Sequence, residues 1–138
     1  MEHPNLRDRL RSLPVFGESL PEFNTEGAPF DPAVLFIEWL ELAIADGVAQ
    51  PHAMTLATGN RSGEPSARTL LLKDVTADGF WFATMSSSPK GRDLEANYSA
   101  ALVFYWREHG RQVRVTGAVR QEPSVAAHRT LPCVCRGI

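Results

Sequence analysis

The sequence lacks the features that mark membrane proteins and nucleic-acid-binding proteins. No apolar run is long enough to cross a bilayer, and the first residues carry charges where a signal peptide needs an apolar stretch. The formal net charge of -2 provides no basic field that would attract nucleic acid. These absences predict a cytoplasmic protein that has neither a membrane nor a nucleic acid as its partner.

Cysteine is scarce, and histidine shows no metal-ligand spacing. Cys133 and Cys135 are too few for a four-ligand zinc site and too close together for an unstrained disulfide. We expect both to be incidental reduced thiols in a reducing compartment. For His52, His109 and His128 we expect positions in loops or on the surface, and the sequence predicts no metal site.

Length and composition predict a single domain that spans residues 1–138. The 138 residues contain 43% apolar and 22% charged residues, as an ordinary globular domain does. Residues 1–30 carry scattered prolines and no sustained period, which predicts an irregular N-terminal arm. Asp31 and Pro32 have the pattern of a helix start, and apolar residues recur at helical spacing until Asp46 and Gly47. A helix is therefore expected over residues 31–47.

Short β-favouring runs separated by turn residues follow the helix. The pattern predicts strands over residues 53–58, 65–73, 80–84, 100–106 and 111–120, with a short helix over 90–97. Closely spaced strands joined by turns favour an antiparallel barrel, in a mainly β fold with flanking helices (α+β). Barrel strands thus occupy residues 53–120, and residues 121–138 form a divergent tail. The three tryptophans are expected in core and interface packing.

Cations and hydroxyl groups lie at the ends of three predicted strands. Arg68 and Lys73 bracket an apolar run, residues 86–91 contain three serines and Lys90, and residues 110–114 contain two arginines and Gln112. A strand interior seldom carries a cation unless an anion lies at its edge, so the pattern suggests one phosphate-bearing ligand. Strict alternation of side chains along a regular strand puts Arg68 and Lys73 on opposite faces of that strand. Either a bulge intervenes, or the two cations serve different parts of the ligand.

Five segments, in order and at matching spacing, carry a resemblance to a known family. They cover residues 51–58, 65–73, 88–91, 104–106 and 111–117. Together they resemble the flavin-binding half of the pyridoxamine 5'-phosphate oxidase family, over about residues 31–120. The resemblance implies an FMN-binding split β-barrel and a homodimer with FMN in two clefts between the subunits. It also implies oxidation of pyridoxamine or pyridoxine 5'-phosphate to pyridoxal 5'-phosphate, with oxygen as the electron acceptor.

The resemblance also implies which residues contact the cofactor. Arg68 and Lys90 correspond to cations on the flavin and its phosphate, Lys73 reaches the substrate phosphate as well, and Gln112 faces the isoalloxazine from the other subunit. No catalytic nucleophile is implied, because the flavin carries the redox chemistry. The complete set of implied cofactor contacts is Arg68, Thr69, Leu70, Leu71, Leu72, Lys73, Ala83, Thr84, Pro89, Lys90 and Gln112.

Each of the polar residues in this set also has a structural interpretation. Arg68 in isolation is typical of a strand-edge cation in a surface ion pair, Lys90 of an exposed lysine at a helix start, and Gln112 of a solvated strand residue. A lysine at a helix N-terminus is electrostatically unfavourable unless an anion lies there, which favours the phosphate interpretation.

The chain departs from the family pattern at several positions. Ala83 stands where the family has tyrosine, Pro89 where it often has arginine, and Met85 where asparagine is common. Agreement ends near Pro123, and the family's C-terminal substrate clamp has no counterpart in the residues that follow. This pattern is typical of a truncated or frame-shifted product or of a trimmed relative. It predicts a protein that holds flavin but turns over pyridoxine 5'-phosphate weakly.

Three functions stay open at this point. The first is an FMN-dependent oxidase of a B6 phosphate or of a related small aromatic substrate, as in phenazine-pathway relatives. The second is a flavin-binding split barrel without B6 oxidase turnover. The third is a deazaflavin-dependent reductase, since that cofactor also occupies split barrels.

Overall fold

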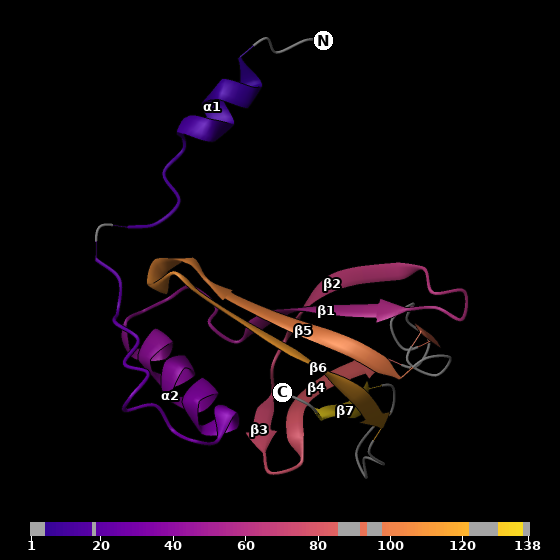
Figure 1. Cartoon of the computed structure of the whole chain (residues 1–138). Coiled ribbons are helices and arrows are strands. Elements are labelled where there is room, and N and C mark those ends of the chain that lie inside the picture. The colour runs from indigo at the N-terminus through magenta and orange to yellow at the C-terminus, as the bar shows by residue number, and fades with distance from the viewer. Residues whose placement is uncertain (1–4, 18, 86–91, 94–97, 122–129, 137–138) are drawn as a thin grey trace.

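A single antiparallel sheet dominates the fold. The computed structural model describes residues 5–17, 19–85, 92–93, 98–121 and 130–136. The strands are β1 (Ala53–Gly59), β2 (Pro65–Leu71), β3 (Asp74–Thr76), β4 (Gly79–Met85), β5 (Ser99–Trp106), β6 (Arg111–Gln121) and β7 (Thr130–Arg136). They form one sheet in the order β2-β1-β5-β6-β7-β4-β3, and each pair of neighbours is antiparallel (Figure 1). With two α-helices, this is the mainly β split-barrel fold that the sequence predicts.

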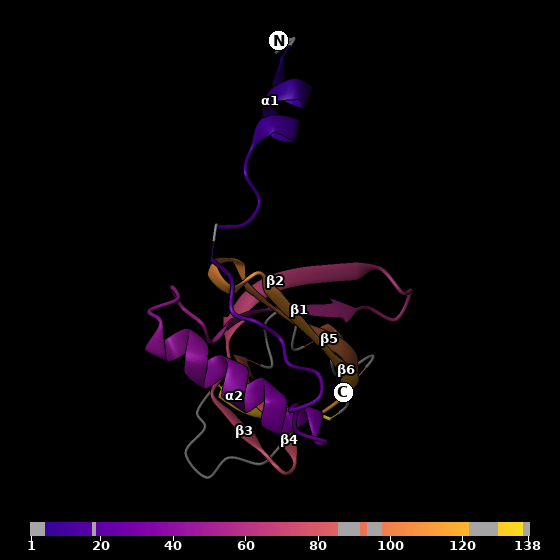
Figure 2. The same cartoon turned by 60° about the vertical axis from the view of Figure 1, so that its left-hand side comes forward.

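The inner face of the sheet forms the core. Alternate residues of β1 and β5, such as Leu56 and Leu102, are buried, because successive side chains of a strand point to opposite faces. Phe36 enters this core from helix α2 (Pro32–Ala45) and packs against Phe80 and Phe104, with ring centroids 5.0 Å and 4.8 Å away. Figure 2 shows α2 lying across one end of the curved sheet. This packing determines where the helix sits.

Helix α2 begins and ends close to where the sequence predicts. The Asp31 side chain accepts a hydrogen bond from the Ala33 amide at 2.9 Å, and Pro32 occupies the first turn. The helix stops at Asp46, after which Gly47 adopts a left-handed φ of 71°. The cap, the proline and the glycine therefore fix the length of this element locally.

The expectation of an irregular arm is wrong for part of the N-terminal segment. Helix α1 (Leu6–Ser12) lies there, and none of its residues is buried. It projects away from the sheet in both views (Figures 1 and 2). Leucine and arginine are good helix formers, and this local preference outweighs the absence of a long period. Neither of the two described α-helices is long and apolar enough to span a bilayer.

The predicted set of five strands omits β3 and β7. Strand β3 has three residues and pairs only with β4, so its sequence carries almost no alternation. Strand β7 lies between β6 and β4, within the residues that the sequence analysis assigns to a divergent tail. Pro132 lies within this interior strand and faces Ala83, a position that proline seldom occupies. Tertiary pairing overrides that local signal. Of the helix predicted over residues 90–97, only Arg92 and Asp93 lie within the described residues, and both are helical.

Candidate functional site

The sheet curls so that the end of β2 meets β4. The Leu72 amide donates to the His52 carbonyl, and the Lys73 amide donates to the Trp81 carbonyl, both at 2.8 Å. This places the predicted cofactor segment, residues 68–73, along β2 and beside the strand that holds Ala83 and Thr84. The fold thereby joins two segments of the predicted site that are about ten residues apart in the sequence. We call this junction the β2–β4 seam.

Arg68 lies on the inner face of β2. It is opposite Leu56 in the register, and its side chain is 22% exposed. Its Nη1 donates to the Leu56 carbonyl at 3.0 Å and to the Thr58 hydroxyl at 2.8 Å. Arg68 is therefore neither an extended surface cation nor a fully buried one. Its guanidinium is held by these contacts and stays partly exposed, and we call this partly exposed position on the inner face of β2 the barrel mouth.

Strand β2 has a free backbone edge in the described part of the sheet. It is the first strand in the sheet order and pairs only with β1, from Pro65 to Leu71. Peptide groups on the outer side of such a strand are ready to pair with other polar groups. A flavin ring has a polar edge that needs amide or carbonyl partners. The backbone of residues 69–71 fits that requirement.

Lys73 lines a cavity that Arg68 does not line. The β1–β2 register is regular through Leu71, so no bulge separates the two cations, and Lys73 follows the end of the strand. Lys73 is exposed and lines a cavity of about 310 Å³ beside α2. The other lining residues are Ile37, Leu40, Glu41, His52, Leu72, Asp74 and Val75. One cation thus faces the barrel mouth, and the other faces a cavity beside the helix.

Gln112 lies away from Arg68 within one chain. It belongs to β6, three strands from β2 in the sheet, and it is exposed between the inward-facing Arg111 and the half-buried Val113. Because side chains alternate, Gln112 lies on the opposite face of the sheet from Arg68. A single chain does not bring these two predicted contacts together.

The remaining predicted contacts lie partly outside the described residues. Thr69, Leu70 and Leu71 belong to β2, and Ala83 and Thr84 belong to β4. Pro89 and Lys90 fall in residues 86–91, which the structure does not describe. The prediction of a phosphate contact at Lys90 therefore stays a prediction.

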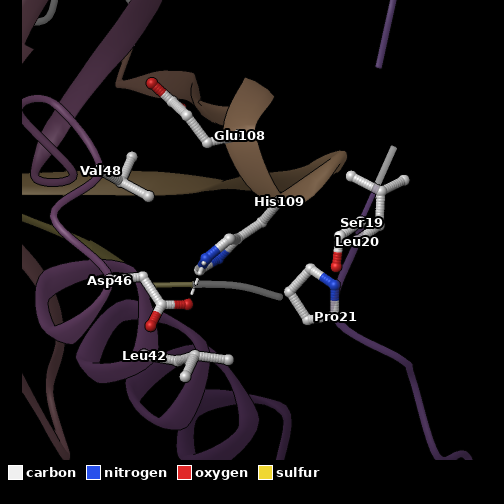
Figure 3. Close-up of a pocket in the computed structure, with 8 residues that line it drawn as sticks. All are labelled: Ser19, Leu20, Pro21, Leu42, Asp46, Val48, Glu108 and His109. Atoms are coloured by element: carbon white, nitrogen blue, oxygen red, sulfur yellow. Dashed lines mark hydrogen bonds and ion pairs between the residues drawn. The ribbon is translucent and has the colours of Figure 1, made fainter. Parts of the chain in front are cut away.

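His109 lies in the connection between two strands, as expected, but its side chain is buried and not on the surface. His109 ends the short 3₁₀ helix η1 (Arg107–His109), and it is only 5% exposed. Its Nε2 lies 2.9 Å from Asp46 Oδ2, at the C-terminal end of α2. Figure 3 marks this contact with a dashed line. These residues line a cavity of about 420 Å³ with Leu20 and Pro21 of the N-terminal segment. Nothing in the local sequence signals this pair, because residues 46 and 109 meet only through the tertiary fold.

Arg111 is a second partly desolvated cation, at the other end of the sheet. Its guanidinium carbon lies 4.2 Å from the centroid of the Trp39 ring, and its Nη2 donates to the Glu22 carbonyl at 3.1 Å. Burial lowers the pKa of the Arg111 guanidinium from its usual value. In the described part of the chain, no group of three histidine, cysteine or acidic residues is placed to hold a metal ion.

Sequence reasoning missed three residues beside Arg68, namely Thr58, Ser66 and Asp93. Thr58 and Ser66 share the inner face with Arg68, because they pair with each other two positions along the register. The hydroxyl of Thr58, on the inner face that Met54 and Leu56 otherwise make apolar, was the available signal. Asp93 reaches the site from a separate segment, and its side chain lies 3.8 Å from Arg68 Nη2. No local pattern predicts that contact.

Comparison with known proteins supports the resemblance found in the sequence. The pyridoxamine 5'-phosphate oxidase family profile matches residues 40–131. A pyridoxine/pyridoxamine 5'-phosphate oxidase from Nostoc sp. is 45% identical over 104 residues, which cover 75% of this chain and 47% of the relative. The corresponding enzyme from Erythrobacter litoralis is 47% identical over 97 residues, which cover 70% of this chain and 46% of the relative. The chain thus spans about half the length of the curated relatives it matches.

Solved structures agree on the fold. The crystal structure of PhzG from Burkholderia lata, in complex with tetrahydrophenazine-1-carboxylic acid, superposes with a TM-score of 0.72 and 31% identity. That match covers 76% of this chain and 53% of PhzG. An FMN-binding protein from Nostoc punctiforme has a TM-score of 0.60 and 23% identity, over 74% of this chain and 54% of that protein. The chain therefore belongs to the pyridoxamine 5'-phosphate oxidase family.

Proposed function

We propose that this chain binds FMN at the β2–β4 seam and forms the flavin-binding part of an oxidase of B6 phosphates. The observation that carries the proposal is the Arg68 guanidinium, which neutral oxygens hold in place at the barrel mouth. Arginine binds phosphate through charge-assisted hydrogen bonds, often in a bidentate manner. The outer edge of β2 supplies backbone groups for the polar edge of the ring. FMN, when bound, supplies the two-electron redox chemistry of the reaction.

The proposed site is completed by a second copy of the chain. Gln112 lies on the outer face of the sheet, three strands from β2, so it reaches a flavin ring at the edge of β2 only from a partner subunit. That outer face carries mostly short or moderately sized side chains, which favours close approach of two flat surfaces. From β2, β1, β5 and β6 they are Ala67, Thr69, Leu71, Ala53, Thr55, Ala57, Ala101, Val103, Tyr105, Gln112, Arg114 and Thr116. We infer a homodimer that pairs through this face.

Lys73 is the proposed contact for the substrate phosphate. Its position beside the β2–β4 seam places it next to the cofactor segment, and it lines a cavity with Glu41, His52 and Asp74. The cation suits a phosphate, while the two carboxylates suit an amine such as that of pyridoxamine. In this arrangement the chain's own residues bind and orient the substrate, and no side chain acts as a nucleophile.

A related aromatic compound is a second candidate substrate. PhzG, which was crystallised with tetrahydrophenazine-1-carboxylic acid, shares 31% identity and a TM-score of 0.72 with this chain. That compound carries a carboxylic acid group, which is anionic as the phosphate of a B6 phosphate is. Lys73 can pair with either anion, so the substrate has to be decided by direct comparison.

The decisive experiment combines flavin binding with turnover. Purified protein should show flavin absorbance and bind FMN more tightly than riboflavin, because each charge-assisted contact to phosphate contributes roughly 1.5 to 3 kcal/mol. Equal affinities for the two flavins would remove the phosphate-site assignment. The flavin-loaded protein should then release peroxide with pyridoxine 5'-phosphate faster than with tetrahydrophenazine-1-carboxylic acid. The reverse order would favour the phenazine-type substrate, and the absence of turnover with both would leave a flavin-binding module.

We also propose that residues 1–138 turn over a B6 phosphate slowly. Lys73 is the one described residue that we assign to the substrate phosphate, whereas the match covers 47% of the Nostoc relative. Loss of orientation of a substrate costs on the order of a hundredfold in rate for small misplacements. We therefore expect residues 1–138 to oxidise pyridoxine 5'-phosphate with much lower catalytic efficiency than the Nostoc enzyme. Comparable efficiency would contradict this expectation.

A further inference from the structure

Four side chains around Arg68 form a closed hydrogen-bonded ring. Arg68 Nη1 donates to the Thr58 hydroxyl at 2.8 Å, and Nη2 donates to the Ser66 hydroxyl at 2.6 Å. Both hydroxyl groups donate in turn to Asp93 Oδ2, Thr58 at 2.9 Å and Ser66 at 3.4 Å. The two hydroxyls thus connect the cation to the carboxylate. We call this set of four residues the Arg68 ring.

The direction of the hydrogen bonds gives the carboxylate a defined role. A hydroxyl has one hydrogen and two lone pairs. Because Thr58 and Ser66 give their hydrogens to Asp93, their lone pairs are left to face the guanidinium. Asp93 therefore orients two acceptors toward Arg68 without being its principal partner, since its oxygen lies 3.8 Å from Nη2. A direct pair between arginine and a carboxylate is about 2.7 to 2.9 Å long.

The ring is partly shielded from water. Thr58 is 4% exposed and the Asp93 side chain is 16% exposed, whereas Ser66 is exposed, so the shielded side of the ring is the one that Thr58 and Asp93 form. Hydrogen bonds in such surroundings are stronger than on an open surface, and their members are costly to leave unpaired. An exposed ion pair would add little and would not hold the guanidinium in one plane. The geometry is therefore that of a site held in one conformation.

The hydrogen-bond partners of Arg68 among the described residues are three neutral oxygens, so the guanidinium can still bind an anionic ligand. The Leu56 carbonyl and the two hydroxyls use three of the five N–H groups of the guanidinium. Two N–H groups have no hydrogen-bond partner among the described residues. The Asp93 carboxylate, at 3.8 Å from Nη2, offsets only part of the positive charge, because it makes no direct hydrogen bond to the guanidinium. A fixed fork with free donors and an incompletely balanced charge favours an incoming dianion.

We propose that Thr58 and Asp93 are positioning residues that set the selectivity of this site for a phosphate-bearing flavin over an unphosphorylated one. This inference rests on the proposed function, because it takes Arg68 as the phosphate contact. Arginine carries about 2 kcal/mol of rotamer entropy, and a side chain that is already fixed does not lose it again on binding. Thr58 accordingly raises the affinity for FMN without touching the ligand itself.

The test compares FMN and riboflavin affinities of three threonine variants. Thr58→Val removes the hydroxyl while keeping the shape of the side chain, and Thr58→Ser restores it. Thr76→Val is the matched control, because the Thr76 hydroxyl also has two hydrogen-bond partners, Trp81 Nε1 at 2.7 Å and the Asp78 amide at 3.2 Å. Flavin fluorescence quenching gives each dissociation constant.

We expect Thr58→Val to weaken FMN binding about tenfold, which corresponds to the loss of one hydrogen bond to a charged group. Riboflavin affinity should stay the same, because riboflavin has no phosphate. Thr58→Ser and Thr76→Val should both retain FMN affinity within about twofold. Unchanged FMN affinity in Thr58→Val, or an equal loss for both flavins, would overturn the positioning role.

The Asp93→Ala variant distinguishes two roles of the carboxylate, which either orients the two hydroxyl groups or competes with the flavin phosphate. If the carboxylate orients the hydroxyls, its removal should weaken FMN binding, by less than Thr58→Val does. If the carboxylate instead occupies the place of the phosphate, its removal should strengthen FMN binding. That second result would contradict the proposal.

A measurement without flavin distinguishes failure of this inference from failure of the proposed function. Residues that share one hydrogen-bond network show non-additive effects on the free energy of unfolding. We therefore expect Thr58→Val and Arg68→Met to be non-additive in urea denaturation of the flavin-free protein. Additive effects would overturn the ring itself. If the two substitutions are non-additive but the wild-type protein binds no flavin, the ring stands. The FMN assignment and the selectivity proposed from it are then both overturned.

Discussion

Arg68 and Arg111 occupy the inner face of the same sheet but have different surroundings. Arg68 is held by three neutral oxygens at the barrel mouth and keeps free donors. Arg111 is 8% exposed, lies against the Trp39 ring, and donates to the Glu22 carbonyl. Its Nη1 is buried without a hydrogen-bond partner among the described residues. A fixed, accessible cation suits a ligand, whereas a desolvated cation between chain segments suits a structural contact.

The comparison predicts that substitutions near Arg68 change ligand selectivity and that substitutions near Arg111 change stability. Arg111 joins three segments, because it contacts α2 through Trp39 and the N-terminal segment through Glu22, and itself belongs to β6. His109 lies two residues away and joins the same end of the sheet to Asp46. Substitutions at Arg68, Asp46 and Arg111 test whether one end of the sheet serves binding and the other serves stability.

Arg68→Met should have the largest effect on ligand binding. We expect FMN affinity to fall roughly tenfold to hundredfold, the equivalent of one or two charge-assisted hydrogen bonds, while riboflavin affinity changes little. Titration with each flavin measures both quantities. Arg111→Met should leave the ratio of the two affinities unchanged, and Arg107→Met, at an exposed cation of η1, is a neutral control. A loss of selectivity in Arg111→Met would remove the distinction between the two ends.

Asp46→Ala should have the largest effect on stability at the Arg111 end. It removes the partner of the buried His109 ring and leaves both ring nitrogens without a hydrogen bond from the described residues. An unsatisfied buried polar group costs about 1 to 3 kcal/mol, so the free energy of unfolding should fall by that amount. Urea denaturation measures it. Asp46→Asn should recover most of the loss, since its amide oxygen can accept from the His109 ring. Equal losses in the two variants would show that the charge, and not the hydrogen bond, matters.

Arg111→Met should lower the free energy of unfolding by about 1 kcal/mol. The variant loses a cation–π contact of up to about 2 kcal/mol and one hydrogen bond, but it also removes the cost of burying a charge. The contact with Glu22 is lost at the same time, so residues 13–25 should be cleaved faster in limited proteolysis. An unchanged cleavage rate would show that Arg111 does not hold this segment.

Alanine substitutions of the two turn glycines should show the smallest difference in stability. Gly110 and Gly63 both have a left-handed φ, 60° and 80°, so alanine at either position should cost about 1 kcal/mol of backbone strain. A Cβ at Gly110 would also lie 3.0 Å from Leu20 Cδ1, whereas nothing lies within 4 Å of one at Gly63. Since the Leu20 side chain can rotate, we expect an additional few tenths of a kcal/mol for Gly110→Ala. Thermal denaturation of the pair measures the difference, and a larger loss for Gly63→Ala would contradict it.

The sequence by itself determined the features that depend on local chemistry. The cap at Asp31, the stop at Gly47 and the alternation of β1 and β5 follow from neighbouring residues, so helix α2 and most strands were predictable. The residues of five segments also carried a resemblance to the family, and the profile match and the relatives confirm it. Strand β7 was not predictable, because Pro132 weakens its local signal and only pairing with β4 and β6 makes it a strand.

Only the tertiary structure decided which side chains meet. Arg68 was recognisable from its strand, but its contact with Asp93 spans 25 positions of the chain, and the pair of His109 and Asp46 spans 63. The structure also places Gln112 on the opposite face of the sheet from Arg68, which local alternation could not show without the order of the strands. The physical reason is that periodicity fixes the face on which a residue lies, whereas sheet order and curvature fix its neighbours.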